Sequence, residues 1–395
     1  MTTYYDGGTG SPAAGMSAAG VPTAEVPTAS AWGPGAHAPV LPRDEFTGDL
    51  VCTGIAPVTH DVVDVRFRAA DGGSLPYSPG QYYTFTFPGL GPGGEGLDRC
   101  YSVSSAAGGA GAGIEELTIT VKRVPGGPVS TFVHERLRVG DTLRGDGPYG
   151  VFGSDVRPGA GALYLSAGSG ITPFLSMMRT RAAPAVGGGW SGPLWSSVVH
   201  IHAAHAPADL IHRAELLGFS GRDQTTVIPV CSTDSPAESW AGVRGRLTAQ
   251  ELAVLVPDLL EREVLVCGPT AFMEAVVAMV VELGVPAERI HLESYVFGER
   301  PRVPAQASAG VFSIEFRGAG RTVQCPAGTT ILAAAREAGI AHPSSCSEGV
   351  CGTCKATMLS GEVDMDHQGG IRPREVREGK ILPCCSVPRT DVVLE

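Results

Sequence analysis

Hydrophobic and polar positions follow three patterns along the 395-residue chain, and the first of them covers residues 44–155. Apolar and polar residues alternate there in short runs, which are separated by turns that contain Gly or Pro. Alternation with a period of two is typical of β-strands with one buried face. The runs occupy residues 50–52, 62–67, 82–87 and 117–122. They predict a small antiparallel barrel that closes near residues 150–152.

The second pattern covers residues 156–298, where apolar runs alternate with stretches of helical periodicity. Strands are expected at 162–166, 198–202, 226–230 and 263–267. Helices are expected at 172–181, 206–217, 248–255 and 271–283. Alternation of this kind predicts a doubly wound α/β domain around a parallel sheet.

The third pattern begins after a Pro-containing stretch at 299–310, which is typical of a linker. Residues 311–395 open with a strand at 311–316 and contain a helix at 330–338, for which Gly339 is a natural C-cap. We expect an α+β domain here. Residues 1–43 are mostly small or polar, so they cannot bury enough surface to offset their ordering entropy and are predicted to be disordered. A docking tail anchored on Trp32 is the alternative.

Composition excludes several classes of protein. The net charge of −11 without a basic run argues against nucleic-acid binding. No uninterrupted apolar run of about eighteen residues is present, so no membrane span is expected. The ten cysteines cluster late in the chain, and no secretory signal precedes them. We therefore expect a cytoplasmic protein with reduced thiols; its oligomeric state is open.

The cysteines carry the most specific signal. Their spacing is C-x4-C-x2-C followed by one distant thiol, which is the plant-type [2Fe–2S] arrangement. The expected ligands are Cys346, Cys351, Cys354 and Cys384. Glycines in this loop let backbone N–H groups bend toward the cluster sulfurs. A structural zinc site is the alternative, but it usually needs a second close pair of ligands. The thiol next to Cys384, that of Cys385, is a rival for the fourth position.

Residues 99–105, Arg-Cys-Tyr-Ser-Val-Ser-Ser, are predicted to start a strand after a Gly-rich turn. In an alternating strand, Arg99, Tyr101 and Val103 face one side, whereas Ser102 and Ser104 face the other. The Arg99 guanidinium suits a phosphate, Tyr101 can stack on an isoalloxazine ring, and Ser102 can hydrogen-bond flavin N5. An ordinary barrel strand is the alternative.

A second phosphate-binding element is expected at residues 125–131, which open a helix and contain Gly127, Val129 and Ser130. Backbone N–H groups at a helix N-terminus bind phosphate. Two separate phosphate elements favour FAD over FMN.

A nucleotide loop, G-x-G-x-T-P, follows the first strand of the α/β domain and contains Gly168, Gly170 and Thr172. Glycines there let a pyrophosphate approach the backbone. Cys267, Gly268 and Pro269 follow a later strand, at the sheet edge where ligands bind. Cys267 is also compatible with a buried thiol that only fills space.

The choice of nucleotide depends on Asp234, which follows the third strand of this domain. A carboxylate there repels a 2′-phosphate and accepts a hydrogen bond from a ribose hydroxyl, which favours NADH over NADPH. Arg244 and Arg246 weaken this interpretation, because either could bind a 2′-phosphate. Both could equally be solvated surface charges.

These motifs, in this order, resemble the ferredoxin–NADP reductase superfamily, and the order of the three modules resembles the single-chain reductases of multicomponent oxygenases. The resemblance covers about nine tenths of the chain. It implies a plant-type ferredoxin domain of the β-grasp type at the C-terminus. It also implies that Cys267 lies beside the nicotinamide and that Glu293 approaches the flavin edge, where a plain surface carboxylate is the equal alternative.

The same resemblance implies an enzyme that passes electrons from NADH through FAD and the [2Fe–2S] cluster to a one-electron acceptor protein. The segments 361–372 and 381–386 resemble the branch that serves Rieske oxygenases demethylating glycine betaine and similar quaternary amines. Reductases for a hybrid-cluster protein or an acyl-CoA desaturase are the alternatives. A non-catalytic iron–sulfur redox sensor is a more distant one, against which the flavin and nicotinamide motifs argue.

Overall fold

The computed structural model describes residues 45–91, 93–108, 114–153, 157, 159–183, 195–293, 310–344, 349, 352–367 and 369–395. The segment predicted to be disordered, 1–43, lies outside these residues, as does the predicted linker apart from Gly310. The described residues belong to one compact unit, His37–Glu395.

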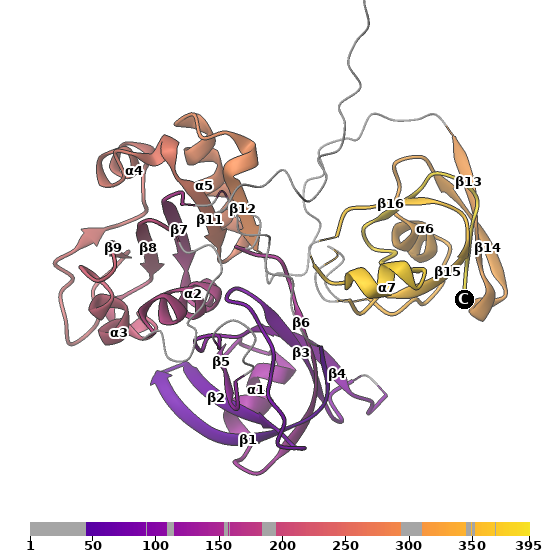
Figure 1. Cartoon of the computed structure of the whole chain (residues 1–395), viewed down its shortest axis with the longest axis horizontal. Coiled ribbons are helices and arrows are strands. Elements are labelled where there is room, and N and C mark those ends of the chain that lie inside the picture. Colours follow the sequence, from indigo (N-terminus) through magenta and orange to yellow (C-terminus); the bar gives the residue numbers. More distant parts are fainter. Residues whose placement is uncertain are drawn as a thin grey trace, which may run out of the picture. The chain divides into compact units, whose positions relative to one another are not determined.

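Six antiparallel strands form the first sheet, in the order β4-β3-β6-β1-β2-β5 (Figure 1). A bridge between Val103 and Ile119 joins its two edges, so the sheet curls into the predicted barrel. Helix α1, Pro128–Glu135, begins with Pro at a first-turn position, where the missing N–H costs nothing. The strands are β1 Phe46–Thr59, β2 Val62–Ala69, β3 Tyr82–Phe87, β4 Leu97–Ser102, β5 Leu117–Lys122 and β6 Thr142–Tyr149.

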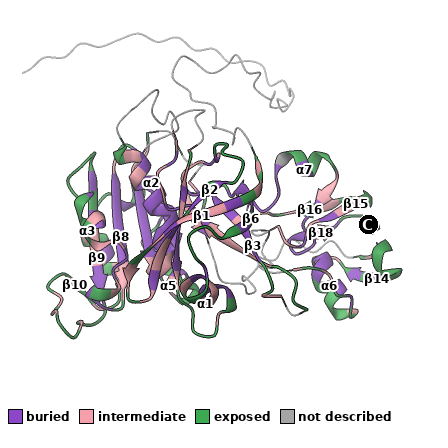
Figure 2. Cartoon of the chain, turned by 90° about the horizontal axis from the view of Figure 1, so that it is seen from below, coloured by how far each residue is buried: buried purple, intermediate pink, exposed green. Residues whose placement is uncertain are grey.

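The second sheet is entirely parallel, in the order β10-β9-β8-β7-β11-β12. Apolar residues of α2 and α3 cover one face, and those of α4 and α5 cover the other, as the doubly wound prediction requires. Figure 2 shows that the inner strand β8 is buried along most of its length, and β7 and β11 are buried likewise. The elements are β7 Ala162–Ala167, α2 Thr172–Ala182, β8 Val198–Ala204, α3 Arg213–Gly218, β9 Thr225–Cys231, β10 Val243–Arg244, α4 Ala249–Leu255, β11 Glu263–Cys267, α5 Thr270–Glu282 and β12 Ile290–Glu293.

The prediction of one continuous helix over residues 206–217 is wrong. A 3-10 turn at Pro207–Asp209 comes first, and α3 begins only at Arg213. Between them, His212 adopts a left-handed backbone conformation with φ of 52°. Its imidazole Nε2 lies 3.2 Å from a carboxylate oxygen of Asp64 in the barrel. A contact to another part of the chain thus accompanies a break that local periodicity does not reveal.

The C-terminal domain combines a five-stranded sheet, in the order β14-β13-β19-β15-β17, with helix α6. Thr330 caps this helix by accepting a hydrogen bond from the Ala333 N–H. A two-stranded sheet of β16 and β18 accompanies the main sheet. The elements are β13 Val311–Phe316, β14 Arg321–Pro326, α6 Ile331–Glu337, β15 Ala356–Ser360, β16 Val363–Met365, α7 Pro373–Arg377, β17 Lys380–Ile381, β18 Ser386–Pro388 and β19 Val392–Leu394.

Among the described helices, none has both the length and the apolar character that crossing a lipid bilayer demands.

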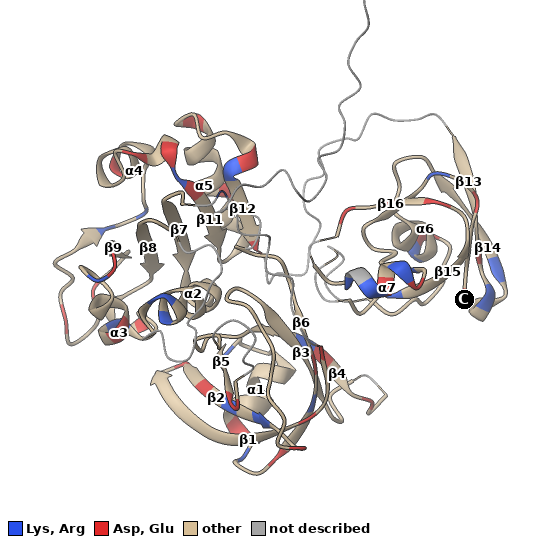
Figure 3. Ribbon diagram, viewed as in Figure 1, with Lys and Arg blue, Asp and Glu red and all other residues tan. Residues whose placement is uncertain are grey.

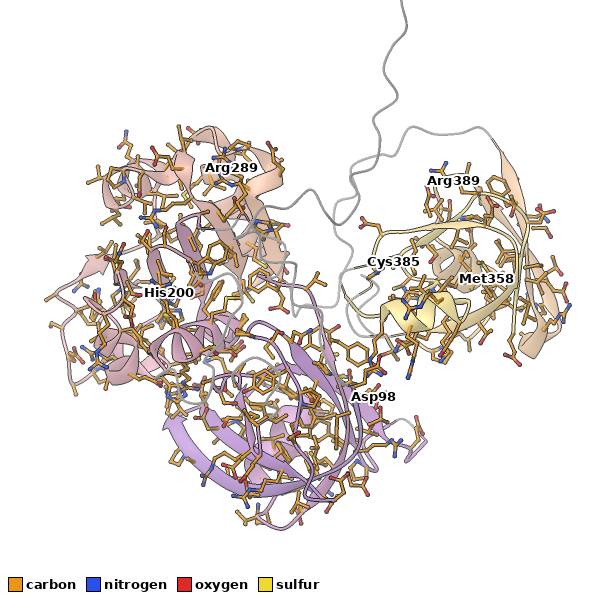
Figure 4. All side chains as sticks on the ribbon, viewed as in Figure 1. Asp98, His200, Arg289, Met358, Cys385 and Arg389 are labelled. Carbon is orange, nitrogen blue, oxygen red and sulfur yellow. The ribbon has the colours of Figure 1, made fainter. Side chains whose placement is uncertain are left out.

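Two histidines are fully buried inside the parallel sheet. The Ser166 hydroxyl lies 2.8 Å from Nε2 of His200 and 2.8 Å from Nδ1 of His202, so it is shared between both rings. Figure 4 labels His200 within the sheet domain. Burial lowers the pKa of His200 well below its usual value and lowers the pKa of His202 to about 4. Both rings are therefore neutral at pH 7.

These imidazoles should make stability depend on pH. The unfolded chain binds protons on histidine below a pKa of about 6.5, whereas the native rings resist protonation until the pH is much lower. The contribution of these neutral imidazoles to stability is therefore complete above the unfolded pKa of about 6.5 and is lost as the pH falls below it. Because of His202 alone, the free energy of unfolding should fall by about 2 kcal/mol between pH 7 and pH 5. His202→Gln should flatten the pH dependence of urea unfolding by that amount. His60→Gln, at a side chain that is 66% exposed, is the control for loss of a histidine at the surface.

Candidate cofactor sites

Two of the four predicted cluster ligands lie within the described residues, and both are buried. Cys354 lies in the turn that the Lys355 N–H closes on the Gly352 carbonyl, and Cys384 precedes β18. They share one apolar cluster with Leu332, Ile371 and Leu382. Cys346 and Cys351 lie outside the described residues.

The backbone around Cys384 suits a thiolate. The Gly349 N–H donates a hydrogen bond to the Cys384 Sγ over 3.2 Å. Gly349 has φ of +72°, and a Cβ there would lie 2.7 Å from the Cys385 Sγ, so only glycine fits. The Cys385 thiol instead donates to the carbonyl of Leu382, at 3.6 Å. Hydrogen bonds from backbone N–H groups to the ligand sulfurs stabilise iron–sulfur clusters, so these residues fit the cluster and favour Cys384 over Cys385.

The flavin motif lies on β4, although not at its start as predicted. The strand begins at Leu97 and leaves Arg99 as its third residue, because β4 pairs with all of β3. The half-buried Tyr101 ring meets Phe85 and Phe87 edge-on at centroid distances of 6.1 and 6.2 Å. Burial raises the pKa of this phenol well above its usual range. The tyrosine is thus a fixed, uncharged surface, as stacking on a flavin requires.

The other residues of this motif are more deeply buried. Ser102 is 4% exposed, Val103 lies in the barrel core, and Ser104 is fully buried. The Ser104 hydroxyl donates to the carbonyl of Thr118 over 3.2 Å. The roles predicted for these residues stay predictions.

The predicted second phosphate element forms the turn before α1. Gly126 has φ of +72°, and Gly127 is the N-cap residue. The Ser130 hydroxyl accepts the Val124 N–H at 3.0 Å and so closes this turn. Val129 packs its side chain into the barrel core. The backbone amides of the first turn of α1, rather than the Ser130 hydroxyl, therefore suit a phosphate here.

The nucleotide loop makes a close backbone approach. Gly168 has φ of +52°, and a Cβ on Gly170 would lie 2.3 Å from the carbonyl oxygen of Cys267. The Thr172 hydroxyl donates to the Ser169 carbonyl over 3.1 Å, which fixes the start of α2. This loop fits a pyrophosphate, because it presents backbone without side chains.

Cys267, the last residue of β11, stands in a buried row. Its neighbours in register are Ser166 on β7 and Glu293 on β12. Residues in register on parallel strands face the same side, about 4.8 Å apart. Cys267 is fully buried, and Glu293 is 7% exposed, so Glu293 is not a plain surface carboxylate. Gly268 and Pro269 follow, and Pro269 is the N-cap residue of α5. The predicted positions of Cys267 beside the nicotinamide and of Glu293 at the flavin edge stay predictions.

Asp234 and Arg244, the rivals for control of nucleotide choice, form one ion pair. The Arg244 Nη2 lies 2.6 Å from Oδ1 of Asp234, which also accepts the Trp240 N–H at 2.7 Å. These contacts lower the pKa of Asp234, and the pair with Arg244 is the larger cause. The Arg244 guanidinium is therefore already paired with a carboxylate.

Sequence reasoning missed the residues that join α2 to the flavin strand. The Arg179 Nη1 donates to the Ser104 carbonyl over 2.8 Å, and its other guanidinium nitrogens bind Glu215 at 2.8 and 2.6 Å. The Ser176 hydroxyl donates to the Ser105 carbonyl over 2.8 Å. The only available signal was their position on the helix that follows the nucleotide loop.

Comparison with known proteins places three family models in chain order. An oxidoreductase FAD-binding domain matches residues 50–153, an oxidoreductase NAD-binding domain matches residues 164–278, and a 2Fe-2S iron-sulfur cluster binding domain matches residues 314–389.

Two curated relatives cover nearly the whole of their own length. The glycine betaine monooxygenase reductase subunit of Pseudomonas aeruginosa is 35% identical, over 87% of this chain and 94% of that protein. The stachydrine N-demethylase reductase subunit of Rhizobium meliloti is 36% identical, over 88% of this chain and 96% of that protein. The crystal structure of phthalate dioxygenase reductase shares the fold, with a TM-score of 0.50 and 24% identity, over 88% of this chain and 98% of that one.

The two adjacent cysteines should differ when each is replaced. Cys384→Ser should remove or severely perturb the cluster, because it removes the thiolate that the ligand spacing assigns to iron. Cys385→Ser, the matched control, should retain about two irons per chain. Iron analysis and visible absorption measure both outcomes. Loss of iron from the Cys385 variant alone would make Cys385 the fourth ligand, and zinc without iron in the wild type would overturn the cluster.

Proposed function

Because the chain belongs to the family of reductases that join FAD-binding, NAD-binding and 2Fe-2S domains in one polypeptide, we propose that it serves a terminal Rieske oxygenase that demethylates a quaternary amine. The observation that carries the proposal is end-to-end similarity to two reductase subunits, one of a glycine betaine monooxygenase and one of a stachydrine N-demethylase. Glycine betaine and stachydrine are both quaternary amines. A location in the cytoplasm, where thiols are kept reduced, is part of the proposal.

When bound, the cofactors would supply chemistry that differs in electron number: a hydride from the nicotinamide, a two-electron acceptor in the flavin and a one-electron carrier in the cluster. The residues of this chain bind and orient these groups. Gly168 and Gly170 admit the pyrophosphate, and Tyr101 offers a ring face to the flavin. Cys384, with its N–H donor, is a ligand of the cluster.

Reconstitution with an oxygenase tests the proposal. The full-length holoprotein is mixed with the terminal component of a glycine betaine monooxygenase, NADH and glycine betaine. We expect substrate-dependent NADH oxidation and formation of the demethylated amine. A steroid in place of the amine is the control and should give only the background rate. A wild type whose flavin and cluster are reduced by NADH, but which supports no amine oxidation with such oxygenases, would contradict the proposed acceptor.

NADH should be the preferred donor, and the pair of Asp234 with Arg244 should decide it. Asp234→Asn removes the carboxylate that repels a 2′-phosphate and releases Arg244 to bind it. The ratio of kcat/KM for NADPH to that for NADH should then rise about five-fold or more. Glu238→Gln, which breaks the neighbouring ion pair with Arg213, is the control and should leave the ratio unchanged. A wild type that prefers NADPH would show that this interpretation of the loop is wrong.

A further inference from the structure

The run Gly369-Gly370-Ile371-Arg372 lies between β16 and α7, and only its Ile371, which packs beside Cys354 and Cys384, belongs to a cofactor site described above. In the structure this run, which we call the docking segment, contacts the flavin barrel. The Gly150 N–H, just after β6, donates to the Gly369 carbonyl over 3.3 Å. A Cβ on Gly369 would lie 2.6 Å from the Gly150 Cα, so the two backbones touch.

Arg372 connects this segment to the barrel with its charge. Its Nη1 lies 2.9 Å from a carboxylate oxygen of Glu45, and its Nη2 lies 2.7 Å from Oδ1 of Asp146. Its guanidinium carbon stands 4.4 Å from the ring centroid of Tyr149. The side chain is only 10% exposed. Because this guanidinium contacts two carboxylates and a ring face and is shielded from water, its interaction with the barrel is stronger than that of an exposed ion pair.

Lys355 makes a second contact to the same tyrosine. Its Nζ lies 3.1 Å from the Tyr149 hydroxyl and 4.7 Å from the ring centroid, and Glu375 neutralises it at 2.9 Å. Lys355 directly follows Cys354, a predicted cluster ligand. Tyr149 stacks in turn on Tyr82, with the ring centroids 5.8 Å apart, and Tyr82 pairs in register with Ser102 of the flavin motif.

The docking segment also reaches the cluster loop. The Gly370 N–H donates to the Gly349 carbonyl over 3.0 Å, and the Gly349 N–H binds the Cys384 Sγ. The contacts therefore form a continuous connection from the flavin strand, through Tyr149 and the docking segment, to a cluster ligand. Figure 3 shows charged residues of both signs on α7, the helix that follows the segment.

We propose that Arg372 and Lys355 are positioning residues, which hold the cluster domain on the flavin barrel so that electrons pass from flavin to cluster. In this step the reduced flavin loses one electron and the oxidised cluster gains it, with no bond made or broken in the protein. The proposal depends on the internal relay of the proposed function and is independent of the oxygenase. Holding two reacting groups in a fixed geometry is an ordinary source of rate enhancement.

Rapid mixing of the full-length holoprotein with NADH tests the proposal by separating flavin reduction from cluster reduction. Arg372→Gln should leave the rate of flavin reduction unchanged and slow cluster reduction by about tenfold, which corresponds to about 1.4 kcal/mol. Ferricyanide reduction, which can draw on the flavin directly, should persist. Arg372→Lys should recover part of the rate, because the charge remains but the fork that binds two carboxylates is lost.

Hydrogen–deuterium exchange supplies a readout that does not depend on turnover. In resting holoprotein, peptides that span Gly150 should exchange faster in Arg372→Gln than in the wild type. Arg389→Gln is the matched control, because Arg389 pairs with Asp364 inside the cluster domain and its side chain is 50% exposed (Figure 4). It should change neither the exchange nor the rate of cluster reduction. The reduction potential of the cluster should be the same in all these variants.

Glu45→Gln removes a charge of the same contact from the barrel and leaves the cluster domain unchanged. It therefore tests the proposal even if Arg372→Gln fails to assemble its cluster. It should slow cluster reduction, and in the double variant the two effects should be less than additive. Unchanged cluster reduction and unchanged exchange at Gly150 would overturn the proposal. So would an equal defect in Arg389→Gln, or a shifted cluster potential that accounts for the slower rate. Failure of NADH to reduce the wild-type flavin would instead contradict the proposed function.

Discussion

One close backbone approach governs the nucleotide half of the molecule: Gly170 lies so near the Cys267 carbonyl that no side chain fits between them. This contact brings the loop after β7 against the end of β11. It thereby places the start of α2, and two turns of that helix bring Ser176 and Arg179 to the carbonyls of Ser105 and Ser104, just after β4. The geometry at one glycine is thus linked to the placement of the whole helix against the barrel.

Much of this arrangement could be predicted from the sequence, because it depends on local patterns. Alternation in the strands, glycines after β7 and the thiol spacing all report on neighbouring residues. The break before α3 could not be predicted, since His212 turns toward Asp64, which belongs to the barrel and lies 148 residues earlier. Periodicity describes which face of a helix is apolar, but it does not reveal a polar partner supplied by a distant strand.

The nucleotide loop shows a second limit of sequence reasoning. Asp234 and Arg244 are separate candidates in the sequence, each with an opposite consequence for a 2′-phosphate. In the structure they neutralise each other, so replacing either residue also changes the charge that the other presents to a ligand. Exposed pairs of this kind add little to stability. The pair instead affects which charge is presented to a bound ligand, and that depends on the turn that brings the two residues together.

The docking segment contacts the flavin barrel through residues that bind no cofactor. Its glycines allow two backbones to touch, and Arg372 places a charge that two carboxylates of another domain neutralise. A polar contact of this kind suits a domain with two tasks. Interfaces between domains of one chain resemble transient protein interfaces, which are polar and separable. An apolar interface would hold the cluster more tightly to the flavin, but it would also hinder release toward an external acceptor. Charge pairs define the docked geometry while keeping the cost of separation low, because both sides are well solvated when apart.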